Sequence, residues 1–277
     1  MTRGKMFGLL GLAAVLTLST IAVTPANAAV TLIDRNSVVT IDPNSSNGMY
    51  SWVVDGAQHM NRQWFWYRLG KTGAEASVDK LNLTFLKSSD GNEDPNNERL
   101  VMKYTDPNGK FVMEIDYVLT GGDPGSRTAD IAETITIKNR STEKLDFHFF
   151  QYCDFNLNGD GNSDSVTITG GNTAIQTGLS SSTSETIVAS SPSLVETSLV
   201  PTLLNSLNDP LSPTTLSGIT SAGPGDVCWA FQWDFDIAPG MTVMISKDKL
   251  ITPEPGTLAL VVLGATMMLA RKRRRTA

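Results

Sequence analysis

Short segments in which apolar and polar side chains alternate recur along most of this chain. Ile131, Ile135 and Ile137 share such a segment with Glu133, and the same alternation runs from Leu145 to Cys153. This period of two is typical of β-strands that bury one face. Clusters of Gly, Asn, Asp and Pro separate the segments. Because no long helical pattern interrupts them, we expect residues 29–250 to form an all-β body, an antiparallel β-sandwich of roughly eleven strands.

One hairpin and one irregular region stand out within this body. Asn108-Gly109 lies between two apolar segments, and both residues tolerate the positive φ of a tight turn. Residues 180–225 are rich in Ser, Thr and Pro, with a short apolar patch at Leu199 to Leu207. We expect either a long excursion with a short helix at Leu203 to Leu207 or a partly disordered crossing.

The first residues have the pattern of a secretory signal peptide. Arg3 and Lys5 precede an apolar run that ends near Pro25, and Ala26-Asn27-Ala28 offers the small residues that a signal peptidase accepts. The run is short for a membrane anchor. We therefore expect cleavage after Ala28 and export across the inner membrane.

The other end of the chain combines three elements in order. Pro253-Glu254-Pro255 is followed by an uncharged stretch at 257–270 and then by a basic cluster at 271–275. A helix over the uncharged stretch would be about 21 Å long and would barely span a hydrocarbon core of about 30 Å. The basic cluster favours the cytoplasmic side. The alternatives are a transient single transmembrane helix and a permanent anchor.

This tail, residues 251–277, resembles the PEP-CTERM sorting signal, with Thr252 where valine is frequent. The resemblance covers only the tail. It implies cutting by an exosortase and a final place at the cell surface or outside the cell, in bacteria that make exopolysaccharide and biofilm. Signal peptidase, the exosortase, the inner membrane and exopolysaccharide are then the expected partners.

The net charge of the body limits the classes of partner that it can bind. The two ends hold seven of the chain's 22 basic residues, so the body carries a net charge near −13. Such a surface repels nucleic acid and anionic lipid, whereas divalent cations and cationic polymers remain compatible with it.

The chain has two cysteines, Cys153 and Cys228, both in predicted strands of the exported body. An oxidising compartment permits a disulfide between them. Two buried free thiols are the alternative, because two cysteines give no framework from which to infer a pairing.

A segment after the predicted strand at 145–153 resembles a calcium loop of the EF-hand type. Oxygen-bearing side chains alternate there with glycines, but the twelfth position is Ser165 and no flanking helices are predicted. A polar turn is the alternative, since Asn, Asp and Gly favour turns for conformational reasons. No other cofactor is expected. The candidate calcium ligands are Asp154, Asn156, Asn158, Asp160 and Asp164.

Trp64 and Trp66 occupy one face of a predicted strand whose other face is also aromatic. Exposed indoles would stack on sugar rings. The alternative is a central strand that is buried on both faces.

No familiar catalytic motif is present. Two of the carboxylates Asp116, Glu133 and Asp154 could form a glycosidase pair, but carboxylates on strands are mostly solvated. His148 is expected at the surface. We therefore expect an exported surface or matrix-associated structural protein that is not an enzyme. The alternative is a secreted carbohydrate-binding module or a glycan-active enzyme.

Overall fold

The computed structural model describes residues 29–92 and 94–254. The predicted cleavage site at Ala26 and Ala28, Pro255 of the predicted sorting motif and the stretch at 257–270 lie outside them. Within the described part of the chain, no helix is long and apolar enough to cross a bilayer.

Eighteen strands occupy the described residues, more than the roughly eleven expected. Up to Phe155 they are β1 (Val30–Asp34), β2 (Ser37–Asp42), β3 (Gly48–Val54), β4 (Ala57–Gln58), β5 (Met60–Leu69), β6 (Ala76–Ser77), β7 (Asn82–Ser89), β8 (Arg99–Thr105), β9 (Phe111–Gly121), β10 (Ala129–Asn139) and β11 (Leu145–Phe155). After it come β12 (Asp164–Thr169), β13 (Thr173–Thr177), β14 (Ser181–Ala189), β15 (Leu194–Leu199), β16 (Ser221–Gly225), β17 (Val227–Ile237) and β18 (Thr242–Pro253). One α-helix, α1 (Thr202–Leu207), and the 3-10 helices η1 (Val78–Lys80) and η2 (Leu157–Gly159) complete the elements of this part.

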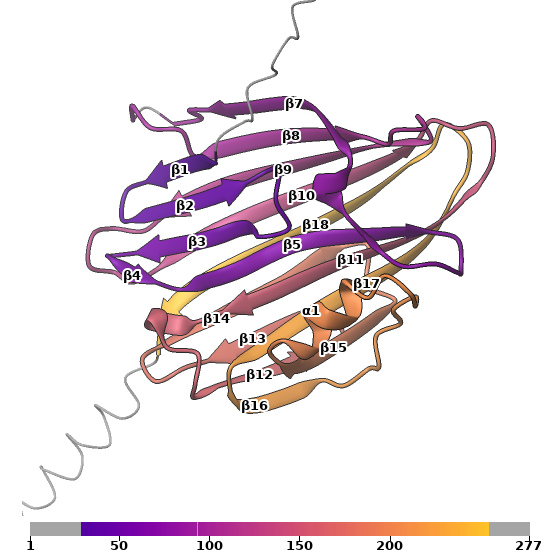
Figure 1. The fold of residues 1–277 in the computed structure, drawn as a ribbon. Helices are drawn as coiled ribbons and strands as arrows, with labels where there is room; N and C mark the ends of the chain where they lie inside the picture. The colour runs from indigo at the N-terminus through magenta and orange to yellow at the C-terminus, as the bar shows by residue number, and fades with distance from the viewer. Residues whose placement is uncertain (1–28, 93, 255–277) are drawn as a thin grey trace, which may run out of the picture.

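The strands form two nine-stranded sheets that pack face to face, as the predicted sandwich requires (Figure 1). Pairing is antiparallel apart from one short parallel contact between β3 and β5. We call the sheet that contains β11 the first sheet and the sheet that contains β18 the second sheet. Their orders are β1-β2-β3-β5-β11-β17-β15, with β4 on β3 and β6 on β5, and β16-β12-β13-β14-β18-β10-β9-β8-β7.

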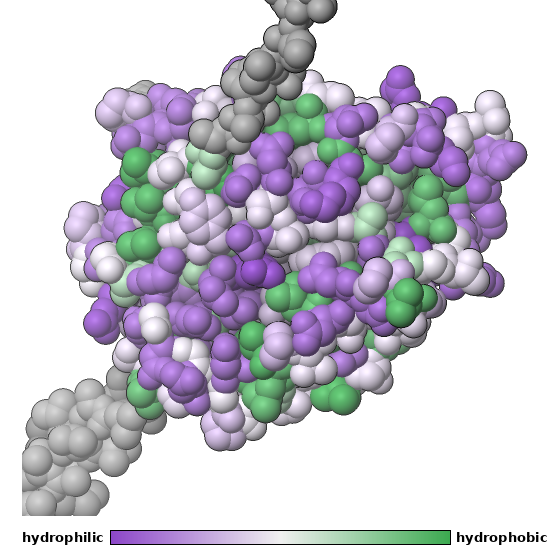
Figure 2. Space-filling view, viewed as in Figure 1, coloured by the Kyte–Doolittle hydropathy of each residue, from purple (hydrophilic) through white to green (hydrophobic). Residues whose placement is uncertain are grey.

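The core lies between the sheets and is dominated by aromatic side chains. Phe65 stacks on Phe149, with ring centroids 5.5 Å apart, and Phe155 stacks on Trp229 at 5.4 Å. These contacts join β5, β11 and β17, the central strands of the first sheet. The surface seen in Figure 2 is mainly hydrophilic, with apolar residues in small separated groups.

The region 180–225 is more ordered than the sequence indicated. It holds β14, in which Ser and Thr make up five of nine residues, as well as β15 and β16, and the short helix was expected at the right place. Thr is β-branched and fits a half-buried strand, so low hydrophobicity there did not mean disorder.

The chain around α1 covers part of the outer face of the first sheet, the face turned away from the second sheet (Figure 1). Asn208 Oδ1 accepts a hydrogen bond from Trp66 Nε1 at 3.1 Å. The Leu216 amide donates to Gln232 Oε1 at 3.0 Å, and Thr214 O accepts from Arg68. This cover ends before the first residues of β11, which leaves that end of the outer face open.

Candidate functional site

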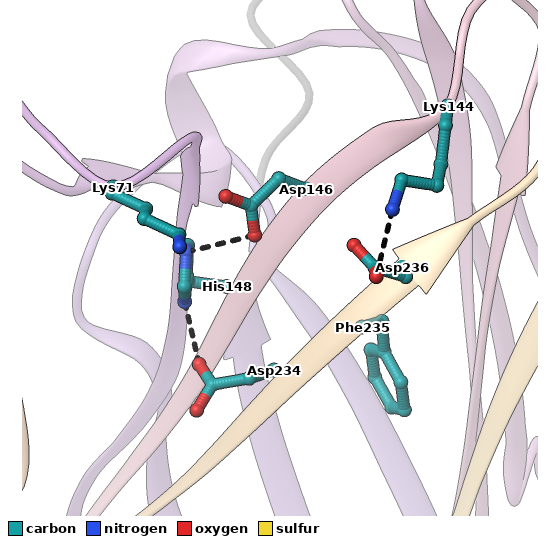
Figure 3. A pocket seen from close by; sticks show the side chains of 7 residues that line it. All are labelled: Lys71, Lys144, Asp146, His148, Asp234, Phe235 and Asp236. Carbon is teal, nitrogen blue, oxygen red and sulfur yellow. Dashed lines mark hydrogen bonds and ion pairs between the residues drawn. The ribbon is translucent and has the colours of Figure 1, made fainter.

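An open pocket of about 600 Å³ lies on the outer face where β11 begins and β17 ends (Figure 3). Antiparallel pairing places Asp146 opposite Asp236 and His148 opposite Asp234. Residues directly opposite one another project to the same face, so the four polar side chains gather there. The lining residues are Lys71, Lys144, Asp146, His148, Asp234, Phe235 and Asp236.

His148 lies between two carboxylates. Its Nδ1 is 2.5 Å from Asp234 Oδ1, and its Nε2 is 3.2 Å from Asp146 Oδ1 (Figure 3). The second contact lacks hydrogen-bond geometry, which leaves Nε2 without a hydrogen-bond partner in the protein. The imidazole is thus oriented through Nδ1, while Nε2 is buried beside Asp146 Oδ1 at the wall of the pocket.

Neighbouring groups hold the carboxylates in place. Gln232 Nε2 donates to Asp234 Oδ1 at 2.9 Å, and the Asp234 amide donates to Ser193 Oγ at 3.0 Å. Lys144 Nζ donates to Asp236 Oδ2 at 2.8 Å. A carboxylate fixed by neighbours orients a histidine more strictly than a mobile one does.

This arrangement can exchange protons with a bound ligand. Histidine is the most frequent general acid or base in enzymes, and a hydrogen-bonded carboxylate selects its tautomer and stabilises its charged form. The remaining lining groups donate and accept hydrogen bonds. The pocket therefore suits a small, hydroxyl-rich ligand better than an apolar one.

The two indoles that were predicted to contact a glycan do not line this pocket. Trp64 and Trp66 are both 0% exposed, so neither can stack on a sugar and that prediction is wrong. Trp64 packs edge-on against Tyr104, and Trp66 packs against Tyr152 beneath the chain that follows α1. The alternative of a central strand buried on both faces is the one observed.

Of the two arrangements left open for the cysteines, a disulfide and two buried free thiols, the second is observed. Cys153 and Cys228 are both buried free thiols. Cys153 pairs with Trp229 and Cys228 pairs with Asp154, so the two thiols leave neighbouring strands on opposite faces. Side chains that point apart in this way cannot be bridged without moving the backbone.

The segment after β11 does not form an EF-hand. Strands flank it, Asn158 Nδ2 donates to Ser180 Oγ and Ser181 Oγ, and Asp160 accepts from Asn162. Asp154 Oδ2 also accepts from Asn61 and Asp164 Oδ2 from Gln176, so four of the five predicted ligands are engaged within the protein. Across residues 29–92 and 94–254, no three His, Cys, Asp or Glu side chains converge to hold a metal by themselves.

The carboxylates that were expected to be solvated divide into two groups. Asp116 is partly exposed and pairs with Arg99, as expected. Glu133 and Asp154 are buried, so that expectation is wrong for them, and His148 proves to be a largely buried pocket residue. The register of β11 against β17 would have identified Asp146 and Asp234 as neighbours of His148, but the sequence alone does not reveal that these two strands pair.

No family model matches the sequence, and no curated protein matches it. Among solved structures, a bacterial glucoamylase complexed with acarbose is similar in fold, with 9% identity and a TM-score of 0.54. The match covers 83% of this chain and 32% of the glucoamylase chain, so this chain spans about a third of that protein.

Two further structures are similar at lower scores. One is a putative aldose 1-epimerase from Escherichia coli K12, with 8% identity, 82% and 99% of the two chains covered and a TM-score of 0.48. The other is a galactose mutarotase-like protein from Lactobacillus casei ATCC 334, with 11% identity, 81% and 100% covered and a TM-score of 0.47.

The prediction that the chain is not an enzyme is contradicted at the level of the fold. It rested on missing catalytic motifs, whereas the two-sheet architecture is one that a bacterial glucoamylase shares. A contiguous motif is not required when reactive side chains come from separate strands. His148 and Asp234 come together in this way, 86 positions apart in the sequence.

Proposed function

We propose that this chain is an exported carbohydrate-active protein that binds a sugar in the His148 pocket and exchanges protons with it. The observation that carries the proposal is the His148 imidazole, which lies between Asp234 and Asp146 in the wall of an open polar pocket. The fold shared with a glucoamylase supports the ligand class, although that protein's whole activity does not transfer to a chain a third of its length.

The lining groups suit sugar hydroxyls. Asp146, Asp234 and Asp236 offer acceptors, while Lys71 and Lys144 offer donors. A sugar hydroxyl both donates and accepts, so alternating carboxylates and ammonium groups can satisfy several hydroxyls of one ring. The openness of the pocket suits the end of a longer glycan, which would include exopolysaccharide.

The simplest reaction that these side chains could support is proton transfer at the reducing end of a sugar. One group removes the proton of the anomeric hydroxyl while another protonates the ring oxygen, the C1–O5 bond breaks, and an open-chain aldehyde forms. The reverse steps give either anomer. We assign this exchange to His148 and to the Asp146 carboxylate, whose Oδ1 lies 3.2 Å from His148 Nε2.

Saturation-transfer-difference NMR of the full-length chain with aldoses and oligosaccharides tests binding, and exchange NMR between anomers tests the chemistry. We expect His148→Ala and Asp234→Asn to abolish anomer exchange and to weaken binding at least tenfold. Asp116→Asn is the matched control, because it changes a partly exposed carboxylate of the second sheet. Equal behaviour of all three variants would contradict the proposal.

Export and sorting through the two ends complete the proposal. The predicted sorting motif begins at the carboxyl end of β18. Thr252 and Pro253 belong to this strand, which therefore extends beyond the expected boundary at residue 250. The Glu254 amide donates to Ser180 O at 3.2 Å. Mass spectrometry of the mature protein should show both ends removed, with the carboxyl terminus near Glu254. An intact basic terminus in the surface fraction would disprove processing.

A further inference from the structure

His148 has a neighbour on each side that is tied to one irregular segment of the cover. Across the outer face of the first sheet, His148 lies opposite Arg68 of β5 and opposite Asp234 of β17. The described segment 208–216 follows α1 and contains no helix or strand, and we call it the strap. The strap is bonded directly to Arg68 and through one further side chain to Asp234. The position of the strap is therefore linked to that of the imidazole.

Arg68 holds the strap on the β5 side. Its buried guanidinium donates through Nη1 to Thr214 O at 3.1 Å and through Nε to Gly70 O at 3.0 Å. Arg68 also pairs with Glu75, whose carboxylate accepts from the Thr214 amide at 2.9 Å. Breaking a buried ion pair leaves a charge without compensation, which is costly. The strap is therefore held firmly at Thr214.

Two residues further along, the strap fixes the side chain of Gln232. The Leu216 amide donates to Gln232 Oε1 at 3.0 Å, and Gln232 Nε2 donates to Asp234 Oδ1 at 2.9 Å. Gln232 is only 2% exposed and does not line the pocket. A side-chain amide has an acceptor oxygen on one branch and a donor nitrogen on the other. Because the Leu216 amide can only donate, it selects the orientation in which the Gln232 donor faces Asp234.

This orientation matters for the tautomer of His148. An ionised carboxylate can only accept hydrogen bonds, so the Nδ1 atom that lies 2.5 Å from Asp234 Oδ1 carries the proton (Figure 3). If the Gln232 amide were reversed, its oxygen would face the Asp234 carboxylate and repel it. A carboxylate that turns away no longer fixes the ring or its tautomer. The docked strap excludes this arrangement.

We propose that Gln232 is the positioning residue of the His148 pocket and that docking of the strap sets its orientation. The inference rests on the proposed function, because it identifies what regulates proton exchange at that site. Gln232 contacts no ligand and acts on His148 through Asp234. Release of the strap at Leu216 leaves the pocket open and its imidazole misoriented. Proton exchange is then lost, whereas sugar binding is largely retained.

The competing explanation is purely structural. Gln232 would then serve only to bond the Leu216 amide within the cover, and Asp234 would keep its orientation without it. The Asp234 amide donates to Ser193 Oγ, but this bond fixes the backbone and not the carboxylate. The two explanations differ in what they predict for the His148 ring when Gln232 is replaced.

NMR of the full-length chain labelled with ¹⁵N-histidine tests the proposal without any sugar. The chain has only two histidines, His59 and His148, so the ring signals are assigned with His148→Ala. In the native chain we expect the neutral His148 ring to carry its proton almost only on Nδ1. Gln232→Met keeps the length of the side chain and removes both of its hydrogen bonds. We expect this variant to populate both tautomers of His148.

Anomer exchange and sugar binding give the second readout. Gln232→Met should slow exchange at saturating sugar by at least about tenfold and leave the dissociation constant nearly unchanged. Gln176→Met is the matched control. Gln176 is also buried, and it also donates to an aspartate, Asp164, which does not line the pocket. The control should keep both the native tautomer and the native exchange rate.

Tautomer populations that are the same in Gln232→Met as in the native chain would overturn the proposal, as would an equal change in Gln176→Met. If Gln232→Met fails to fold, the native spectrum decides, because a proton on Nδ1 supports the proposal and a proton on Nε2 overturns it. A native chain that exchanges no anomers but shows the expected tautomer change would refute the proposed function. The positioning role of Gln232 would then still be supported.

Discussion

At the scale of single residues, the most demanding feature is a fully buried group of four charges between the sheets. Lys247 contacts Glu133 at 2.5 Å and Glu185 at 3.2 Å, and Lys249 lies 3.0 Å from Glu185 and also pairs with Glu133. Two positive and two negative charges cancel within the group. Removing one partner would leave a buried charge without compensation, which is far more costly than losing a surface pair.

We therefore expect Glu185→Gln to lower the free energy of unfolding by about 3–5 kcal/mol. Glu114→Gln breaks an exposed pair with Lys103 and should lower it by less than about 1 kcal/mol. Urea unfolding of both variants measures the two losses. Similar values would mean that the buried charges are not coupled as the distances indicate.

The same group has a defined pH dependence. Burial alone would raise the pKa of Glu185, but Lys249 and Lys247 outweigh it and hold the pKa at about 2, below the usual 4.5. A carboxylate whose pKa is lower in the folded chain than in the unfolded chain stabilises the fold at pH values above its unfolded-state pKa. That contribution is lost as the pH falls through the folded-state pKa. The difference in the free energy of unfolding between the native chain and Glu185→Gln should therefore be largest above pH 4.5 and should decrease towards pH 2.

The sequence pattern of this group was misinterpreted. Glu133 alternates in step with Ile131, Ile135 and Ile137, which places it on the core face of its strand, although it was expected to be solvated. Its partners come from β14 and β18, more than 50 positions away, and only the sheet order joins them. For the same reason Asp234 could not be linked to His148 before the pairing of β11 with β17 was known.

At the scale of elements, β5, β11 and β17 are buried on both faces because α1 and the chain after it cover the first sheet. The aromatic residues on both faces of β5 indicated such a central strand, but nothing in the sequence showed what covers it. Leu203 and Leu207 of α1 are buried in this cover, and Trp66 lies beneath it.

We expect Leu207→Ala to lower the free energy of unfolding by about 2–5 kcal/mol, the range for a buried leucine. Loosening of the cover should also increase acrylamide quenching of tryptophan fluorescence, because Trp66 becomes accessible. Leu211→Ala is the control, since Leu211 is exposed just after the helix. Quenching that changes equally in both variants would show that α1 does not protect the sheet.

At the scale of the whole molecule, the second sheet places the last described strand at its centre. β18 pairs with β10 on one side and with β14 on the other, so it joins the first half of the sheet to the second. Lys247 and Lys249 of the buried charged group belong to it. A chain that lacks β18 would lose two rows of hydrogen bonds and leave Glu133 and Glu185 buried without their cations.

This arrangement limits where a sorting protease could cut. A chain that ends at Glu254 keeps the whole of β18, so we expect it to unfold cooperatively with a Tm within a few degrees of that of the full-length chain. A chain that ends at Met241 should not fold, because its second sheet would be split. Circular dichroism melts and limited proteolysis of the two truncated chains distinguish these outcomes. Cooperative unfolding of the shorter chain would mean that β18 is peripheral, and processing could then occur further upstream than the sorting motif.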